Sequence, residues 1–184
     1  RHHGLGQHTS GRHADEHVRA AQGLHDVVVL SFARREQGLL LKPGNPLRIA
    51  NLNDAISAGA RFGVRQTGAG AQLLLQSLMR RLGLETSRIR TAQQAYATGQ
   101  DLALAIRGDD IDCGVATRSV ATLNGLDFAP LVWERYDLAM RRRSYFEPGA
   151  QALLACLRTP AFARQAEQLG GYDVSEAGTV RLNV

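Results

Sequence analysis

The chain has 184 residues, of which 44% are hydrophobic and 21% charged, with 19 glycines and 5 prolines. This composition excludes a disordered polypeptide and is typical of one α/β domain, or of two small lobes that share a hinge. No apolar stretch approaches the roughly 18 residues that span a bilayer, and the arginines that carry most of the net charge of +5 are spread along the chain instead of forming a stripe for nucleic acid.

The first 23 residues are rich in histidine and show little hydrophobic periodicity. We interpret segment 1–23 as an arm or as the remnant of a first lobe. His13 and His17 are four residues apart, a spacing that can hold a metal on one helical face, but no cysteine lies nearby. We therefore expect no metal site in this segment.

The next part of the chain favours strands. Residues 27–46 predict a strand, a charged connection, a second strand and a turn, at residues 27–32, 33–37, 38–42 and 43–46. Beyond the turn, the pattern predicts a helix capped by Asn51 or Asn53, a strand, a glycine turn and a second helix, at residues 52–60, 61–65, 66–70 and 71–82. We expect four leucines of the second helix to share its apolar face: Leu73, Leu74, Leu78 and Leu82.

The remaining chain alternates helices and strands. We expect helices at residues 102–106, 117–125, 148–157 and 160–169, and strands at residues 112–116, 128–132 and 136–141. Strands separated by helices of about ten residues predict an α/β fold with a mostly parallel sheet flanked by helices. In such a sheet a ligand lies beyond the carboxyl ends of the strands.

The strongest local signal is the strand-to-helix turn, formed by Arg65, Gln66, Thr67, Gly68, Ala69 and Gly70. A helix N-terminus offers free N–H groups and a partial positive charge, and glycines let a ligand approach the backbone. Arg65 adds a full charge and a forked donor. The alternative is that the glycines only make a tight turn and that Arg65 pairs with a surface carboxylate. The turn lacks both common nucleotide-binding glycine patterns, so phosphate transfer is not supported.

Two further places are candidates for ligand contact. Thr98 precedes a helix, so it is either a second anion-facing N-terminus or a simple N-cap. A polar segment where strands end is expected to cross between lobes, and it contains Glu134, Arg135 and Tyr136. An ordinary alternative for this segment is an internal ion pair of Arg35 with Glu36 or Glu134.

The sequence shows no catalytic group and no cofactor motif. Every histidine lies within the first 25 residues, and Ser31, Ser119 and Ser175 lack a nucleophile-elbow pattern. Cys113 and Cys156 lie in apolar contexts, which predicts two buried, unbridged cysteines and favours a reducing compartment. We therefore expect a protein that is not an enzyme and carries no cofactor.

Several motifs occur in an order that carries a resemblance, at residues 33–39, 43–46, 65–70, 112–114, 126–131, 134–138 and 170–173. Residues 24–178 resemble the periplasmic-binding-protein-like (type II) substrate-binding domain of bacterial helix-turn-helix regulators, which is distantly similar to molybdate-binding proteins. The resemblance implies a two-lobed α/β fold that holds a small ligand, often an oxyanion such as molybdate, between the lobes. It also implies a second lobe at about 45–130, a return to the first lobe at 131–178, and a tail at 179–184.

The chain departs from that family pattern in three places. Ala69 and Ala71 stand where the family has a serine and a threonine, so two hydroxyl donors are missing from the turn. Gly99 stands where the family has a histidine after the threonine. The segment before residue 24 is shorter than the family's first lobe, so we expect that lobe to be truncated.

From the resemblance we expect a small-anion sensing domain of a cytoplasmic transcriptional regulator. Its expected partners are the small ligand and a second copy of the chain, with DNA contacted only through a domain outside this chain and no membrane span. The alternatives are an exported solute-binding component of an ABC transporter and a dimerisation module that has lost its ligand.

Overall fold

The computed structural model describes residues 26–183. Its elements in chain order are β1 (Val27–Leu41), α2 (Leu52–Ser57), β2 (Arg61–Arg65), α3 (Gly70–Arg81), the 3-10 turn η1 (Thr86–Arg88), β3 (Arg90–Tyr96), α4 (Gly99–Arg107), β4 (Cys113–Thr117), α5 (Arg118–Asn124), β5 (Asp127–Arg141), α6 (Arg142–Tyr145), α7 (Pro148–Leu157), α8 (Pro160–Leu169), β6 (Tyr172–Asp173) and β7 (Val180–Asn183). The expected histidine arm lies outside the described residues.

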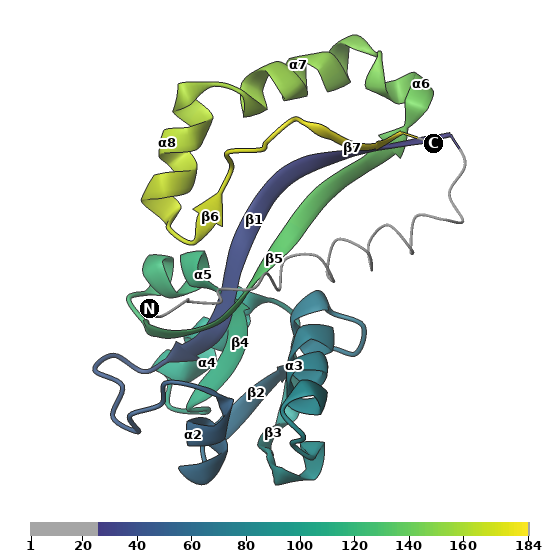
Figure 1. Ribbon diagram of the computed structural model, residues 1–184. Helices are drawn as coiled ribbons and strands as arrows, with labels where there is room; N and C mark the ends of the chain where they lie inside the picture. Colours follow the sequence, from purple (N-terminus) through teal and green to yellow (C-terminus); the bar gives the residue numbers. More distant parts are fainter. Residues whose placement is uncertain (1–25, 184) are drawn as a thin grey trace, which may run out of the picture.

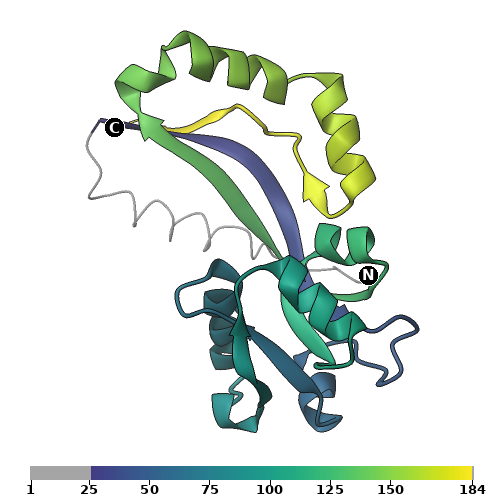
Figure 2. The same cartoon turned by 180° about the vertical axis from the view of Figure 1, so that it is seen from behind.

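The elements form two lobes joined by two long strands (Figure 1). We call the lobe built on β2, β3 and β4 with α2 to α5 the three-strand lobe. The lobe formed by α6, α7, α8, β6 and β7 is called the C-terminal lobe. Strands β1 and β5 run from one lobe into the other, and the view from behind shows the same arrangement (Figure 2).

All strands belong to one sheet, with the order β3-β2-β4-β1-β5 and with β6 and β7 paired to β1. The α/β class and the helix-flanked sheet are confirmed. Parallel pairing holds in the three-strand lobe, where β2 pairs in parallel with β3 and with β4. Every pair along β1 is antiparallel. For β5 this follows because the chain leaves the C-terminal lobe through β1 and returns to it through β5.

The two long strands correct the sequence prediction of four shorter ones. The charged segment 33–37 continues the ladder between β1 and β5 instead of connecting two strands, and the same holds for residues 133–135. The charged side chains in these two segments form ion pairs. The apolar run therefore stops there, although the backbone pairing between β1 and β5 continues. The ladder shifts register twice, between Ser31 and Ala33 and between Gln37 and Gly38.

The three-strand lobe has a core on each face of its sheet. One cluster packs α2 and α3 against one face and includes Leu39, Phe62 and Met79. The other packs α4 and α5 against the opposite face and includes Leu40 and Leu102. A third cluster, in the C-terminal lobe, packs α7 against the other end of β1.

Two sequence predictions about burial were wrong. Leu74 and Leu78 of α3 pack against the core as expected, but Leu73 and the C-cap residue Leu82 are exposed by 54% and 52%, and the apolar face is centred on Leu75 and Met79. The observed buried stripe runs through residues 71, 75 and 79, which are about one helical turn apart. Leu73 and Leu82, at the two ends of the predicted stripe, lie outside it. Cys156 is exposed on α7, while Cys113 is buried as expected, and burial raises the pKa of its thiol.

Most local signals were correct. Asn51 caps α2 by accepting from the Asp54 N–H at 3.0 Å, and α7 and α8 begin at the two expected prolines. Residues 180–183, which the prediction placed in a tail, form β7 and pair with β1. Within residues 26–183, no helix combines the length and hydrophobicity that crossing a bilayer requires.

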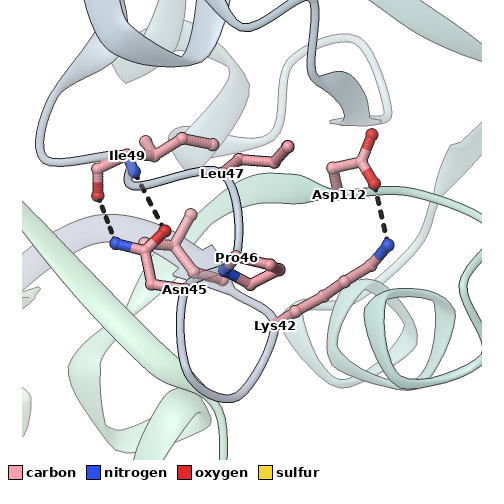
Figure 3. A pocket seen from close by; sticks show the side chains of 7 residues that line it. Lys42, Asn45, Pro46, Leu47, Ile49 and Asp112 are labelled. Atoms are coloured by element: carbon pink, nitrogen blue, oxygen red, sulfur yellow. Dashed lines mark hydrogen bonds and ion pairs between the residues drawn. The ribbon is translucent and has the colours of Figure 1, made fainter.

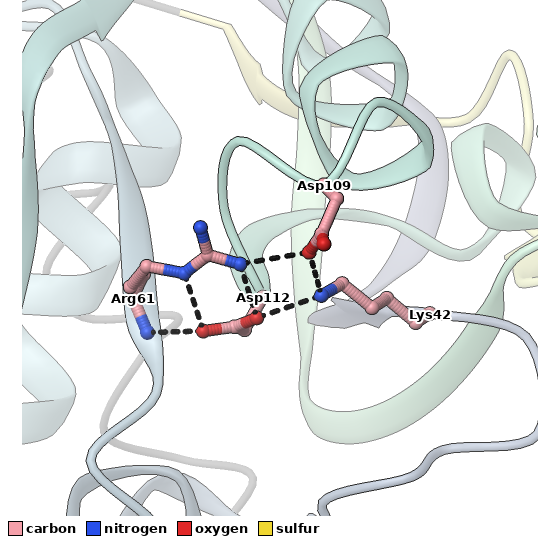
Figure 4. A network of polar contacts seen from close by, with 4 residues as sticks. All are labelled: Lys42, Arg61, Asp109 and Asp112. Atoms are coloured by element: carbon pink, nitrogen blue, oxygen red, sulfur yellow. Dashed lines mark hydrogen bonds and ion pairs between the residues drawn. The ribbon is translucent and has the colours of Figure 1, made fainter.

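A charge network fastens the end of β1 to the three-strand lobe (Figure 4). The Asp112 carboxylate accepts from the Arg61 Nε at 3.0 Å, from the Arg61 Nη2 at 2.9 Å and from the Lys42 Nζ at 2.9 Å. Arg61 and Lys42 also contact Asp109. The Arg61 hydrogen bonds hold the pKa of Asp112 well below its usual range, and those from Lys42 lower the pKa of Asp109.

We expect Asp112→Asn to lower the free energy of unfolding at neutral pH by about 1–3 kcal/mol, because two cations lose a largely buried partner. A carboxylate with a lowered pKa stabilises the fold above its unfolded pKa of about 4, and the contribution is lost as pH falls below that value. The difference between wild type and variant in urea unfolding should therefore narrow from pH 6 toward pH 2. The exposed neighbour Asp110 provides the control, since Asp110→Asn should change little at either pH.

Candidate ligand-binding site

The turn between β2 and α3 has the geometry that the sequence predicts. The Ala69 N–H donates to the Gln66 carbonyl at 3.0 Å, which closes a tight turn. Gly68 has φ +85°, a left-handed conformation that strains other residues. Gln66, Thr67, Gly68 and Gly70 are exposed, so the turn presents its backbone at the surface.

The side chain of Arg65 is directed toward the neighbouring strand. Its Nε donates to the Tyr96 carbonyl at 3.1 Å and its Nη2 to the Ala97 carbonyl at 2.5 Å. Its backbone N–H donates at 3.0 Å to Gln72, which lies in the first turn of α3. Arg65 therefore fixes the turn to the end of β3, and neither sequence interpretation of Arg65 anticipated these bonds.

The N-terminus of α3 keeps its partial positive charge. Its N-cap residue Ala69 makes no side-chain cap, and its first turn contains no acidic residue. The N–H groups of the first turn and the helix dipole therefore favour an anion at this end. Helix α4 differs: Thr98 accepts from the Asp101 N–H at 3.0 Å, and Asp101 accepts from the Thr98 N–H at 2.8 Å. This capping box places a carboxylate on the α4 N-terminus and agrees with the N-cap interpretation of Thr98.

The predicted segment on β5 is held by ion pairs. Glu134 Oε1 accepts from the Arg35 Nε at 2.5 Å and from the Gln37 Nε2 at 2.8 Å, so the ordinary alternative of an Arg35–Glu134 pair is confirmed. The Arg35 guanidinium also lies 4.3 Å from the ring centroid of Tyr136. Arg135 faces the C-terminal lobe and donates to Glu176 at 3.1 Å.

The structure brings some of the predicted residues together and leaves others apart. The 65–70 turn and Thr98 share the carboxyl edge of the three-strand lobe, because Arg65 bonds to Ala97. No hydrogen bond or ion pair between described residues joins that turn to Glu134, Arg135 or Tyr136. Their joint contact with one ligand therefore stays a prediction.

Sequence reasoning placed Gln37 in the charged segment 33–37 but did not name it as a site residue, and its side chain is only 3% exposed. Its Nε2 is bonded to Glu134, and its Oε1 is buried with no hydrogen-bond partner. The available signal was a glutamine at the start of an apolar strand run, where a side chain with two hydrogen-bonding ends is costly to bury.

The opposite face of the junction carries a direct link between the lobes. Arg118, the first residue of α5, pairs with Glu36 on β1 and lies 4.4 Å from the Phe128 ring centroid. The next residue, Ser119, lies at hydrogen-bonding distance, 3.1 Å, from the Tyr172 hydroxyl in the C-terminal lobe. We call Glu36, Arg118, Ser119 and Tyr172 the lobe link.

A small pocket lies at the other end of β1, between Lys42, Leu47, Ile49 and Asp112 (Figure 3). Its volume is about 10 Å³, which is room for about one water molecule. Asn45 closes one side by exchanging two hydrogen bonds of 2.9 Å with the Ile49 backbone. The pocket is therefore too small for an organic ligand. Among residues 26–183, no group of three or more acidic, histidine or cysteine side chains is placed to hold a metal.

Comparison with known proteins gives a family and a set of similar folds. A family model described as a PBP superfamily domain matches residues 4–158. The uncharacterized protein YvgK of Bacillus subtilis (strain 168) is 25% identical over 154 residues, which make up 84% of this chain and 49% of that protein. The chain thus spans about half the length of this curated relative.

Two solved structures share the fold at low sequence identity. PEB3 bound to L-phospholactate gives a TM-score of 0.61 at 15% identity and covers 78% of this chain and 67% of its own. The regulatory domain of CcmR from Synechocystis PCC6803, in complex with 2-PG, gives a TM-score of 0.55 at 16% identity and covers 78% of this chain and 77% of its own.

We expect Arg65→Ala to lower the free energy of unfolding by about 1–2 kcal/mol without any ligand, because two backbone carbonyls lose a charged donor. Urea unfolding measures the change. Arg80→Ala is the control, since Arg80 is exposed on α3 and its side chain makes no hydrogen bond or ion pair to another described residue. Equal stability of the two variants would mean that Arg65 does not hold the turn.

Proposed function

The chain belongs to the PBP superfamily, and from this premise we propose that it is the ligand-binding domain of a cytoplasmic transcriptional regulator that senses a small anion. DNA is contacted through a separate domain of that regulator. In this proposal the domain performs no catalysis and needs no cofactor, which agrees with the ligand-bound domains that share its fold.

One observation carries the anion proposal: the N-terminus of α3. This helix has 12 residues, begins at the carboxyl end of a parallel strand, and has neither a side-chain cap nor an acid in its first turn. Parallel strands place their ligands at this edge, and an uncapped helix N-terminus attracts negative charge there. Arg65 holds the turn in place through the Tyr96 and Ala97 carbonyls.

The similar folds support both parts of the proposal. PEB3 is described as bound to L-phospholactate. CcmR is described as a regulatory domain in complex with 2-PG. We carry from them the idea of a small ligand in a domain of this fold, and from CcmR the idea of regulation.

Sensing follows from the two-lobed arrangement. The anion binds the α3 turn of the three-strand lobe and contacts the junction segment that contains Glu134 and Tyr136. A ligand that touches both favours one relative position of the lobes, and it can shift the population only by its difference in affinity for the two positions. The lobe link carries that change to α5 and β6 on the opposite face.

A thermal-shift panel tests anion binding. We expect at least one of molybdate, tungstate, sulfate, phosphate and small carboxylates to raise the melting temperature. A ligand at about 100 times its Kd adds about 2.7 kcal/mol, which corresponds to roughly 5–10 °C for a chain of this size. Chloride at matched ionic strength is the control. No shift with any anion, for a chain that melts cooperatively, would contradict the proposal.

The site itself is tested at Gly70, the first residue of α3. Gly70→Pro removes one N–H group from the helix N-terminus, and the fold should tolerate it because proline suits the first helical position and Ala69 already has extended angles. Gly70→Ala keeps the N–H group, and a Cβ there meets nothing within 4 Å. We expect the proline variant to bind the active anion about tenfold or more weakly, and the alanine variant to bind it as wild type does. Equal binding by both variants would place the anion elsewhere.

The regulator and dimer parts of the proposal need other measurements. The reading frame before Arg1 should encode a helix-turn-helix domain, whereas an encoded signal peptide would favour an exported solute-binding protein.

Multi-angle light scattering should give twice the monomer mass. A monomer at all concentrations would remove the second copy from the proposal.

A further inference from the structure

We propose that the ligand of this site carries its own hydrogen-bond donor, and that Gln37 Oε1 accepts from it. The expected class is a protonated oxyanion or a hydroxy acid, not a fully deprotonated oxyanion such as sulfate, molybdate or tungstate. The inference rests on the proposed anion site and names the chemical class of its ligand.

Gln37 shares a face of the sheet with α3. Side chains two residues apart on a strand share a face, and Leu39 and Leu41 pack with Leu75 and Met79 of α3. Gln37 therefore lies on the α3 face, one position beyond the core toward the C-terminal lobe.

Gln37 also lies at the level of the α3 turn. Gly63 of β2 pairs with Gly114 of β4, and Thr117 of β4 pairs with Gln37 of β1. Three residues beyond Gly63 is Gln66, so the turn, the end of β4 and Gln37 lie at one height across adjacent strands. β1 lies two strands from β2, about 10 Å across the sheet, so a small ligand on the uncapped N-terminus of α3 lies at the height of Gln37 and on the same face.

Only one end of the Gln37 amide is available to a ligand. A carboxylate only accepts hydrogen bonds, so the atom 2.8 Å from Glu134 Oε1 is the amide nitrogen of Gln37. The amide oxygen therefore points away from Glu134, and it is buried without a partner. A buried acceptor without a donor is unfavourable, and such groups usually have a partner in the functional state.

The chemical consequence is selectivity. At neutral pH inorganic phosphate retains one or two P–OH groups, whereas sulfate, molybdate and tungstate have none. A ligand without a donor would bring lone pairs against the buried Gln37 oxygen, and sites built for a donor reject such analogues strongly. The oxygen is buried, so binding requires the molecule to bend along β1 and β5 and open a path to it.

Matched ligand pairs test the inference on the wild-type chain. Isothermal titration compares phosphate with sulfate, two tetrahedral anions of similar size, and glycolate with methoxyacetate, which lacks the hydroxyl hydrogen. We expect the donor-bearing member of at least one pair to bind about tenfold or more tightly. The pair that shows the preference distinguishes a protonated oxyanion from a hydroxy acid.

A variant assigns the preference to Gln37. Gln37→Met keeps the side-chain length and removes the acceptor, so the preferred ligand should lose at least about tenfold in affinity while sulfate or methoxyacetate binds no more weakly. Gln93→Met is the control, because Gln93 is an exposed residue of β3 with no hydrogen bond from its side chain to another described residue. Should Gln37→Met fail to fold, the wild-type pairs alone decide.

The outcomes separate this inference from the proposal beneath it. If neither phosphate nor glycolate binds more tightly than its matched partner, the donor requirement is overturned and anion binding stays intact. A wild-type preference that survives in Gln37→Met would overturn the role of Gln37. No binding by any anion in the panel would overturn the proposed function, and the inference with it.

Discussion

The backbone ladder between β1 and β5 is the constraint on which the other elements depend. The two strands pair from Val27 and Arg141 at one end to Leu41 and Asp127 at the other. Every further strand of the C-terminal lobe pairs with β1, and the three-strand lobe joins the ladder through β4, which also pairs with β1. The position of the candidate site follows, since the carboxyl edge of β2 and β4 lies where the ladder passes between the lobes.

Most of the fold could be predicted from the sequence where local physics decides. Helices α7 and α8 match their predicted bounds, because a proline at the first position and an apolar period leave one solution. The long strands could not be predicted as single elements. Ladder hydrogen bonds depend on the partner strand and not on side-chain polarity, so Arg35 and Glu134, which face each other, interrupt the apolar pattern without ending either strand.

The candidate site also combines features that local sequence predicts with features that depend on distant partners. The 65–70 turn was predictable because glycine and a following apolar helix are local signals. The partners of Arg65 were not, since the Tyr96 and Ala97 carbonyls lie about thirty positions further along the chain and carry no side-chain signature. Gln37 was missed for a related reason: its significance lies in an unpaired oxygen, and pairing is a property of the folded state.

The sharing of β1 also has a consequence for how the molecule folds. Leu30 belongs to the core of the C-terminal lobe, whereas Leu39 and Leu40 belong to the two cores of the three-strand lobe, and all three side chains are fully buried. Neither lobe keeps its core if β1 detaches, so the lobes are not separate folding units. Their relative movement is thus bending within one cooperative structure, and not the motion of two independent bodies on a linker.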